Sequence, residues 1–251
     1  MKMEKNFRVH NFSFMELCII AVVFLIGGAL LFPVLGAAQG TGKQISCTDN
    51  LKICMRATIS YADDHNGNAI LKYGDSSTGK LLMTMSYGTS VGNTGIKAAE
   101  RLSINSIICP DTTTLPKHFT WHFSEFYAVP YGLFTNNYSL TPYEIPEGFY
   151  TIRKWPNADV AVNFKKLQYP DSAVIYAEAW NAKTRKAHST YGLAKNEMSK
   201  LDFRHGGKNN MAFADGHTEG KEQTFVTEQR EASGISGKWY VFNGKRETVG
   251  L

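Results

Sequence analysis

Charged residues are missing from one long stretch of this 251-residue chain. Between Glu16 and Lys43 there is no Asp, Glu, Lys or Arg, and from Leu17 to Ala38 nearly every residue is apolar. The run matches the roughly 20 residues that a helix needs to cross the hydrocarbon core of a bilayer. Glu16 stands at the start of this run, where a carboxylate is costly in hydrocarbon and therefore indicates a function.

Catalytic signatures and nucleic-acid-binding runs are also absent. The chain has no G-x-S-x-G, no H-E-x-x-H and no phosphate-binding loop, so we predict no enzymatic activity. Its net charge of +5 is not gathered into Lys/Arg runs with interleaved aromatic residues, which disfavours a nucleic-acid partner. The 15 Phe and 12 Tyr residues predict a packed core rather than disorder.

Cysteines are few: Cys18, Cys47, Cys54 and Cys109. No C-x-x-C pair occurs, which disfavours a zinc site. Cys18 lies in the apolar run, where it behaves as a small apolar residue. Cys47 and Cys54 are about two turns apart on a predicted helix, which is too far for a bridge between them. We therefore expect a Cys47–Cys109 disulfide that ties this helix to the body, with Cys54 buried and free.

The charges that flank the apolar run predict its orientation. Lys2, Lys5 and Arg8 precede it, so the positive-inside rule places the leader, residues 1–11, in the cytoplasm and the C-terminal part outside. A cleaved secretory signal peptide with a site near residues 36–38 is the competing interpretation. The run is longer than the apolar region of about 7–15 residues in a signal peptide and begins with an acid, which favours a membrane anchor.

Residues 39–251 are predicted to form one α+β ectodomain. A Gly-rich joint at 36–42 precedes the segment 43–63, which lacks Gly and Pro and places its apolar residues mostly on one stripe, as in an amphipathic helix. Asn66-Gly67 is suited to the turn that follows. The expected architecture is a long N-terminal helix, first transmembrane and then amphipathic, packed on an antiparallel β-sheet.

The β-rich body, residues 68–251, contains short runs of β-branched and aromatic residues separated by turn residues. Such runs are typical of strands. The predicted strands are 81–87, 119–123, 158–164, 173–179, 211–214, 224–226 and 238–242, and a short helix is predicted at 90–103.

The residues around Glu16 resemble the N-terminus of type IV pilins and type II secretion pseudopilins. A short basic leader ends at Asn11, the apolar Phe12 follows, Glu16 comes four residues later, and Pro33 lies twenty-one residues after Phe12. The resemblance implies that a prepilin peptidase cuts before Phe12 and methylates the new amine. Pro33 is expected to kink or locally melt the helix. The family has glycine where this chain has Asn11, so an uncleaved signal anchor is the alternative.

Cleavage before Phe12 would give Glu16 a partner. It creates an ammonium at the edge of the apolar run, and the Glu16 carboxylate of a neighbouring copy can neutralise it, which lowers the desolvation cost of both charges. Many copies of the helix could then pack side by side in a fibre, with Gly27-Gly28 allowing close approach. The expected partners are other copies of this chain or other pilin-like subunits.

A second resemblance lies near the C-terminus. His205 and Asp215-Gly216 are spaced as H-x9-D-G, which resembles the planctomycete-type H-x9-DG pilin-like proteins. Those proteins also begin with a prepilin-type segment, and the resemblance spans residues 11–217. The chain departs from their pattern at Glu178, where Asp is usual, and at Cys54. Their other short motifs correspond here to residues 45–52, 61–64, 109–110 and 131–132.

The sequence leaves the role of His205, Asp215 and His217 open. Asp215-Gly216 is a strong hairpin signal, so the favoured interpretation is structural, with His205 bonded to Asp215 or to a loop carbonyl. The alternatives are a divalent metal site made by these three residues and, least favoured, catalysis. Residues 63–68 offer oxygen ligands for calcium but lack the EF-hand pattern, so helix-end turn chemistry is favoured there and no cofactor is assigned.

These patterns predict a non-enzymatic pilin-like or pseudopilin subunit with a single transmembrane and assembly helix, residues 12–38, in the bacterial inner membrane. The ectodomain would be periplasmic or extracellular, and the subunit would polymerise into a secretion pseudopilus or a surface fibre. The alternative is a permanently anchored envelope protein whose ectodomain binds a ligand or metal near His205.

Overall fold

The fold is described from a computed structural model, in which the chain divides into two compact units, Met1–Gly42 and Lys43–Leu251. The leader residues Asn11 and Phe12 lie outside the described residues. The structure describes residues 13–72, 102–103, 106–111, 129–130, 150–153, 159–167, 169–188, 190–193, 195, 198–232 and 237–251.

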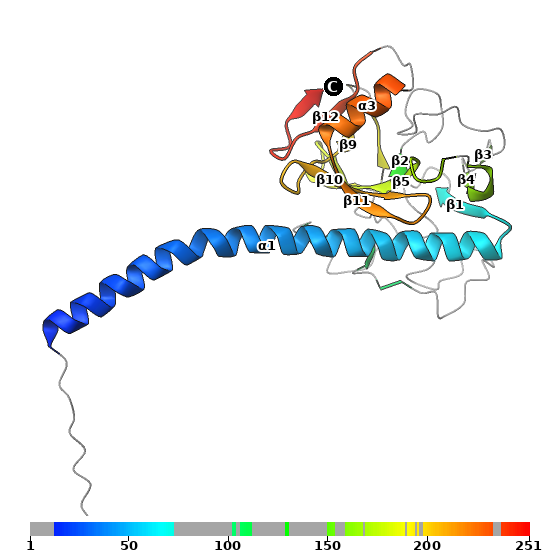
Figure 1. Ribbon diagram of the computed structural model, residues 1–251. Helices are drawn as coiled ribbons and strands as arrows, with labels where there is room; N and C mark the ends of the chain where they lie inside the picture. Colours follow the sequence, from blue (N-terminus) through cyan, green and yellow to red (C-terminus); the bar gives the residue numbers. More distant parts are fainter. Residues whose placement is uncertain are drawn as a thin grey trace, which may run out of the picture. The chain divides into compact units, whose positions relative to one another are not determined.

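The longest element is the helix α1, Phe14–Asp64, of 51 residues (Figure 1). It continues without interruption through Pro33 and through the glycines of 36–42. Of the two expectations for Pro33, a kink or local melting, local melting was therefore wrong, and the Gly-rich segment 36–42 continues the helix. A proline removes one helical hydrogen bond and a glycine costs about 1 kcal/mol relative to alanine, which a long helix can absorb. Within the described part of the chain, no helix combines the length and the apolar character that crossing a membrane requires.

The C-terminal end of α1 is set by a left-handed turn. Asn66 and Gly67 have φ angles of 58° and 86°, and the Gly67 N–H donates to the Ala62 carbonyl at 2.6 Å. This backbone conformation favours glycine and asparagine. A side chain at position 67 would also meet Lys165 Cγ at 2.8 Å. The segment after α1 thus has the helix-end turn chemistry that the sequence favoured.

In the residues that the structure describes, the body is an α+β structure of short strands, antiparallel except for one pair, which confirms the predicted class. The central sheet has the order β11-β10-β5, made of Thr218–Glu222, Lys208–Phe213 and Val174–Ala177. Two three-stranded sheets are β1-β4-β3 (Asn68–Lys72, Asp159–Asn163, Tyr150–Arg153) and β7-β6-β9 (Lys186–Ala187, Ala179–Asn181, Ser199–Leu201). The pairs are β12-β13 (Tyr240–Phe242, Thr248–Gly250) and the parallel β2-β8 (Val129–Pro130, Thr190–Tyr191). The short helices are η3 (Phe164–Lys166) and α3 (Gln223–Ala232).

The central sheet lies between two apolar clusters. Successive residues of a strand face opposite sides of its sheet. Accordingly, Ala212 packs in a cluster with Leu51 and Met55 of α1, whereas Met211 packs in a cluster with Val226 of α3. In Figure 1 the C-terminal part of α1 and the helix α3 lie on opposite sides of β10 and β11. α1 therefore covers one face of the sheet. Ile45, an apolar residue of the predicted amphipathic helix 43–63, is nevertheless exposed.

Most strand predictions that fall on described residues are confirmed. The runs 158–164, 173–179, 211–214 and 238–242 contain β4, β5 with the start of β6, part of β10, and β12. The strand predicted at 224–226 was wrong, since these residues belong to α3. The strands predicted at 81–87 and 119–123 lie outside the described residues, as does the helix predicted at 90–103 except for two residues, which are not helical.

Candidate functional site

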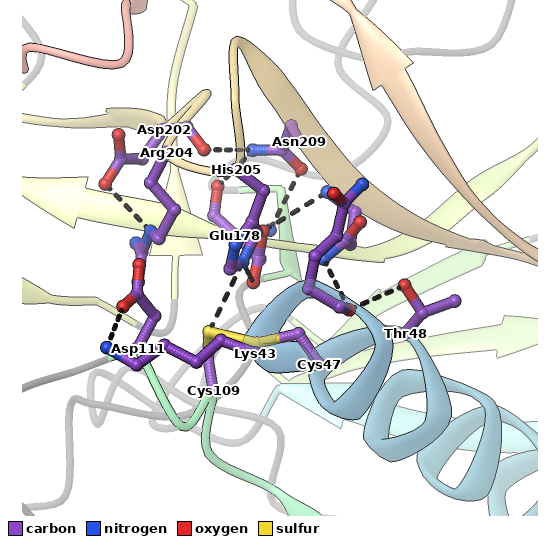
Figure 2. A network of polar contacts seen from close by, with 12 residues as sticks. Lys43, Cys47, Thr48, Cys109, Asp111, Glu178, Asp202, Arg204, His205 and Asn209 are labelled. Atoms are coloured by element: carbon purple, nitrogen blue, oxygen red, sulfur yellow. Dashed lines mark hydrogen bonds and ion pairs between the residues drawn. A yellow bond between two sulfur atoms is a disulfide. The ribbon is translucent and has the colours of Figure 1, made fainter. Parts of the chain in front are cut away.

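A buried polar cluster fastens α1 to the body (Figure 2). Cys47 of α1 and Cys109 form a disulfide with a Cα–Cα distance of 5.1 Å, the pairing that we expected from the sequence. The bond closes a loop with a sequence separation of 62 residues. In the chain-entropy model a loop of this size stabilises the fold by about 4 kcal/mol. Beside it, Lys43 and Asp111 form an ion pair at 2.9 Å.

The acid of this cluster is Glu178, which from the sequence stood out only as a departure from a family pattern. It lies between β5 and β6, is 2% exposed, and its Oε1 accepts from Nε2–H of His205 at 2.9 Å. Its Oε2 accepts from the Asn210 N–H at 3.2 Å. The same Nε2 of His205 lies 3.6 Å from Cys109 Sγ. Burying an unpaired carboxylate costs several kcal/mol, so these bonds are what make Glu178 tolerable in the interior.

A two-glycine turn positions His205. Gly206 and Gly207 have φ angles of 61° and 87°. His205 and Lys208 exchange backbone hydrogen bonds, at 3.2 Å from the His205 N–H and 3.1 Å from the Lys208 N–H. Two successive positive φ values define the type I′ hairpin turn, which glycine adopts at little cost. The His-Gly-Gly sequence therefore explains how a histidine is directed into the interior just before β10.

Asn209, the second residue of β10, holds the backbone on both sides of the pair. Its side-chain amide donates to the Glu178 carbonyl at 2.7 Å and to the Asp202 carbonyl at 3.0 Å, and its oxygen accepts from the Glu178 N–H at 3.2 Å. Asn209 is fully buried, and a buried amide with three such bonds contributes stability instead of costing it.

A second buried acid, Asp202, lies beside the pair. Its Oδ2 is 2.9 Å from Arg204 Nε and 3.6 Å from Arg246 Nε. Burial raises the pKa of Asp202, against the opposing effect of the two arginines, and the nearby Glu178 raises it further. Arg246 also stacks on the Trp180 ring at 3.5 Å. Two acids and two arginines thus balance one another in formal charge.

The structure does not bring His205, Asp215 and His217 together, so the three-residue metal site expected as an alternative is corrected. Asp215 Oδ1 accepts from His217 Nδ1–H at 2.6 Å and from its backbone N–H at 3.0 Å, and the Asp215 side chain is not buried. His205 bonds Glu178 and not Asp215. The physical reason is length: β10, with 6 residues, separates the two positions by roughly 3.3 Å per residue.

Asp215 and Gly216 instead form the turn between β10 and β11, as the hairpin signal predicted. Gly216 has a φ of 96° and its N–H donates to the Phe213 carbonyl at 2.9 Å. A Cβ at position 216 would lie 3.2 Å from Ile59 Cδ1 of α1. The H-x9-DG spacing therefore marks the two turns at opposite ends of one strand.

One grouping in the described part of the chain could hold a metal ion. It consists of Cys47, Cys109, Glu178 and His205, all buried, with one ligand atom each and all four atoms within 4.8 Å of one another. Glu178 was the member that sequence reasoning missed. A single acid inside the apolar run 173–180 was the available signal, because a charge in such a run needs a buried partner.

The N-terminal candidates lie elsewhere in the chain. The N–H of Ser13 donates to Glu16 Oε2 at 2.8 Å and the N–H of Met15 donates to Ser13 Oγ at 3.3 Å. Residues 13–16 therefore form a capping box at the start of α1. Sequence reasoning missed this structural role of Glu16, although Ser-x-x-Glu was visible. Pro33 lies within α1.

Comparison of the chain with protein families, with curated proteins and with solved structures found no match in any of the three.

Proposed function

We propose that this protein is a non-enzymatic pilin-like subunit, held in a bacterial inner membrane by the first part of α1 and able to polymerise through it. The supporting observation is the division of α1 into two different surfaces. From Phe14 to Ile26 the large apolar side chains are 41–79% exposed. From Cys47 onward the same helix has fully buried residues such as Leu51 and Met55.

The exposed apolar surface of α1 must be buried against lipid or protein. Burying one large apolar side chain stabilises a protein by about 1.5–3 kcal/mol. Leaving the apolar side chains of several successive helical turns in water is therefore strongly unfavourable. Contiguous apolar patches of this kind mark membrane or protein contact sites. Lipid would cover the helix in a stored subunit, and neighbouring helices would cover it in a fibre.

The capping box refines the role of Glu16. Cleavage before Phe12 would leave the new ammonium one residue before Ser13, whose N–H already bonds Glu16 Oε2. A carboxylate offers about four acceptor sites, so Glu16 can cap its own helix and still neutralise the amine of a neighbouring copy. In this proposal capping requires a hydrogen-bond acceptor, whereas assembly requires the negative charge.

Substituting Glu16 separates these two requirements. Glu16→Gln keeps an acceptor that suits a capping box but loses the charge, whereas Glu16→Ala loses both. We expect both variants to reach the membrane and neither to form sedimentable fibres when expressed in the native host. Asp49→Ala, which removes an exposed acid from the same helix, is the control and should assemble normally.

Mass spectrometry of the native protein tests the processing step. The expected result is a chain that begins at Phe12 with a methylated amine. A native protein that still carries Met1 would count against the filament proposal and favour a permanently anchored envelope protein. A Glu16→Gln variant that assembles like the wild type would instead refute the charge pairing between Glu16 and the amine of a neighbouring copy.

A further inference from the structure

We propose that Cys47, Cys109, Glu178 and His205 form a zinc site when the two cysteines are reduced, in the place that the disulfide occupies when they are oxidised. The inference concerns the body of the protein and is independent of the proposed filament. It assigns a metal to a different set of residues from the three that the sequence suggested.

The distances between the ligand atoms suit a tetrahedral ion. Zinc bound at about 2.3 Å from sulfur and about 2.1 Å from nitrogen holds these two atoms roughly 3.6 Å apart. Cys109 Sγ and His205 Nε2 are 3.6 Å apart. Glu178 Oε1 and His205 Nε2, at 2.9 Å, would open by about 0.5 Å to reach the tetrahedral separation. The two sulfurs must also part, which reduction of the disulfide permits.

The donor set is one that zinc prefers. Two thiolates, an imidazole and a carboxylate are all zinc ligands, and sulfur donors disfavour calcium and magnesium. The four groups come from four segments: α1, the stretch 106–111, the junction of β5 and β6, and the turn before β10. An ion here would therefore fasten the same parts of the chain as the disulfide does.

The surroundings already orient the ligands. Glu178 Oε2 accepts from the Asn210 N–H, so Oε1 is the oxygen that faces His205. Asn209 fixes the Glu178 backbone from both sides. Hydrogen bonds of this kind to ligating side chains set their direction and raise metal affinity. Only the histidine must change its tautomer, because zinc takes the Nε2 lone pair and leaves the proton on Nδ1.

The formal charge of the cluster is the same in both forms. Glu178 and Asp202 balance Arg204 and Arg246, and the imidazole of His205 is counted as neutral in both forms because zinc binds the neutral ring. Zn²⁺ adds two positive charges and the two thiolates add two negative ones. Neither form therefore leaves an uncompensated charge in the interior, which would cost several kcal/mol.

The two forms are related by a balanced two-electron reaction. A water-soluble phosphine attacks the disulfide and becomes a phosphine oxide with an oxygen atom from water. The two electrons and two protons appear on Cys47 and Cys109 as thiols. Binding of Zn²⁺ then releases both thiol protons to solvent, so that metal affinity rises with pH.

Metal content of the full-length protein in detergent tests the proposal. One sample stays oxidised, the other is reduced with the phosphine without oxygen, and both are incubated with Zn²⁺ and desalted. We expect about one zinc per reduced chain and essentially none per oxidised chain, as for a closed structural site. Co²⁺ in place of Zn²⁺ should give thiolate-to-cobalt absorption in the near ultraviolet.

Variants identify the ligands. We expect His205→Ala and Glu178→Gln to weaken zinc binding by the reduced chain about tenfold or more, and Cys47→Ser to abolish the cobalt–thiolate band. The matched controls are His217→Ala and Cys18→Ser, which should bind zinc like the wild type. Near-ultraviolet circular dichroism monitors the fold of each reduced sample.

Three results would overturn the proposal. The first is a folded, reduced wild-type chain that binds no zinc. The second is zinc binding that His205→Ala and Cys47→Ser leave unchanged. The third is a reduced chain that loses its fold and does not regain it when Zn²⁺ is added. None of these results bears on Glu16 or on fibre formation.

Discussion

At the scale of single residues, Asp202 and Glu178 show how differently two buried acids can be accommodated. Glu178 accepts directed hydrogen bonds from His205 and from the Asn210 N–H. Asp202 relies on ion pairs with Arg204 and Arg246, and burial still raises its pKa above the usual value of 3.8. The protonation of Asp202 should therefore be visible in the pH dependence of stability.

The raised pKa of Asp202 predicts the sign of this dependence. Between its unfolded and folded pKa values, the folded chain holds the Asp202 proton more tightly than the unfolded chain does. The stability that this group contributes is present below the unfolded pKa and is lost as the pH rises through the folded pKa. Asp202→Asn should remove this loss, so the stability of the wild type relative to the variant should fall as the pH rises.

Chemical unfolding of both proteins across a pH series measures the difference directly. The comparison isolates Asp202 because the other titrating groups are shared. A difference in unfolding free energy that is constant with pH, or that grows in favour of the wild type as the pH rises, would contradict the assignment.

At the scale of elements, α1 changes its environment along its length while its backbone remains one helix. Its C-terminal part follows the apolar stripe that the sequence predicted, with Leu51 fully buried and Ile53 42% exposed two residues later. This alternation provides a matched pair of substitutions on one turn of one helix.

Leu51→Ala should lower the free energy of unfolding by about 2–5 kcal/mol, because it removes buried methyl groups and leaves a cavity between α1 and the sheet. Ile53→Ala removes a side chain of similar size that is partly in solvent, and should cost less than about 1 kcal/mol. Denaturant unfolding followed by near-ultraviolet circular dichroism measures both. Equal costs would mean that α1 does not pack on the sheet through this stripe.

The elements also show how far the sequence could be interpreted. Long or strongly patterned segments, such as the helix 43–63 and the strand at 211–214, were predicted because a repeating pattern averages over many residues. The run Thr224–Val226 predicts a strand when it is considered alone, because its three residues are β-branched or aromatic. The good helix formers that follow, at 228–230, decide the helix α3.

The buried cluster was predictable only in part. Spacing excluded a Cys47–Cys54 bond within the helix and so made Cys109 the expected partner, but it did not by itself decide between Cys47 and Cys54. Glu178 and its bond to His205 were not expected, since they join residues from different strands, and no local pattern records which segments a fold brings together. The Asp215–His217 contact is local, because it spans only two residues. Asp215 does not bond His205 instead because the length of β10 keeps these two residues apart.

At the scale of the whole molecule, the boundary between Gly42 and Lys43 separates two compact units that bury their side chains to different extents. The described side chains of residues 13–29 are exposed or half-buried. The residues from Lys43 onward contain both apolar clusters and the disulfide.

A chain that begins at Gly42 should therefore fold without the preceding residues. We expect it to be soluble without detergent and to melt within about 2–4 °C of the full-length protein, which corresponds to a change of about 1 kcal/mol in the free energy of unfolding. Thermal melting followed by circular dichroism, with size-exclusion chromatography, makes the comparison. A truncated chain that aggregates or melts far lower would show that residues before Gly42 support the body.

The position of the disulfide has a mechanical consequence. Among the described side chains of α1, Cys47 is the first that is buried, counted from the N-terminus. Tension applied along the N-terminal end of the helix would thus reach a covalent bond before it reaches the apolar contacts of Leu51 and Met55. Without the disulfide, those contacts would separate one after another along the helix. The disulfide would therefore keep the body intact under a pulling load, and its reduction would leave only the apolar contacts to resist separation of α1 from the sheet.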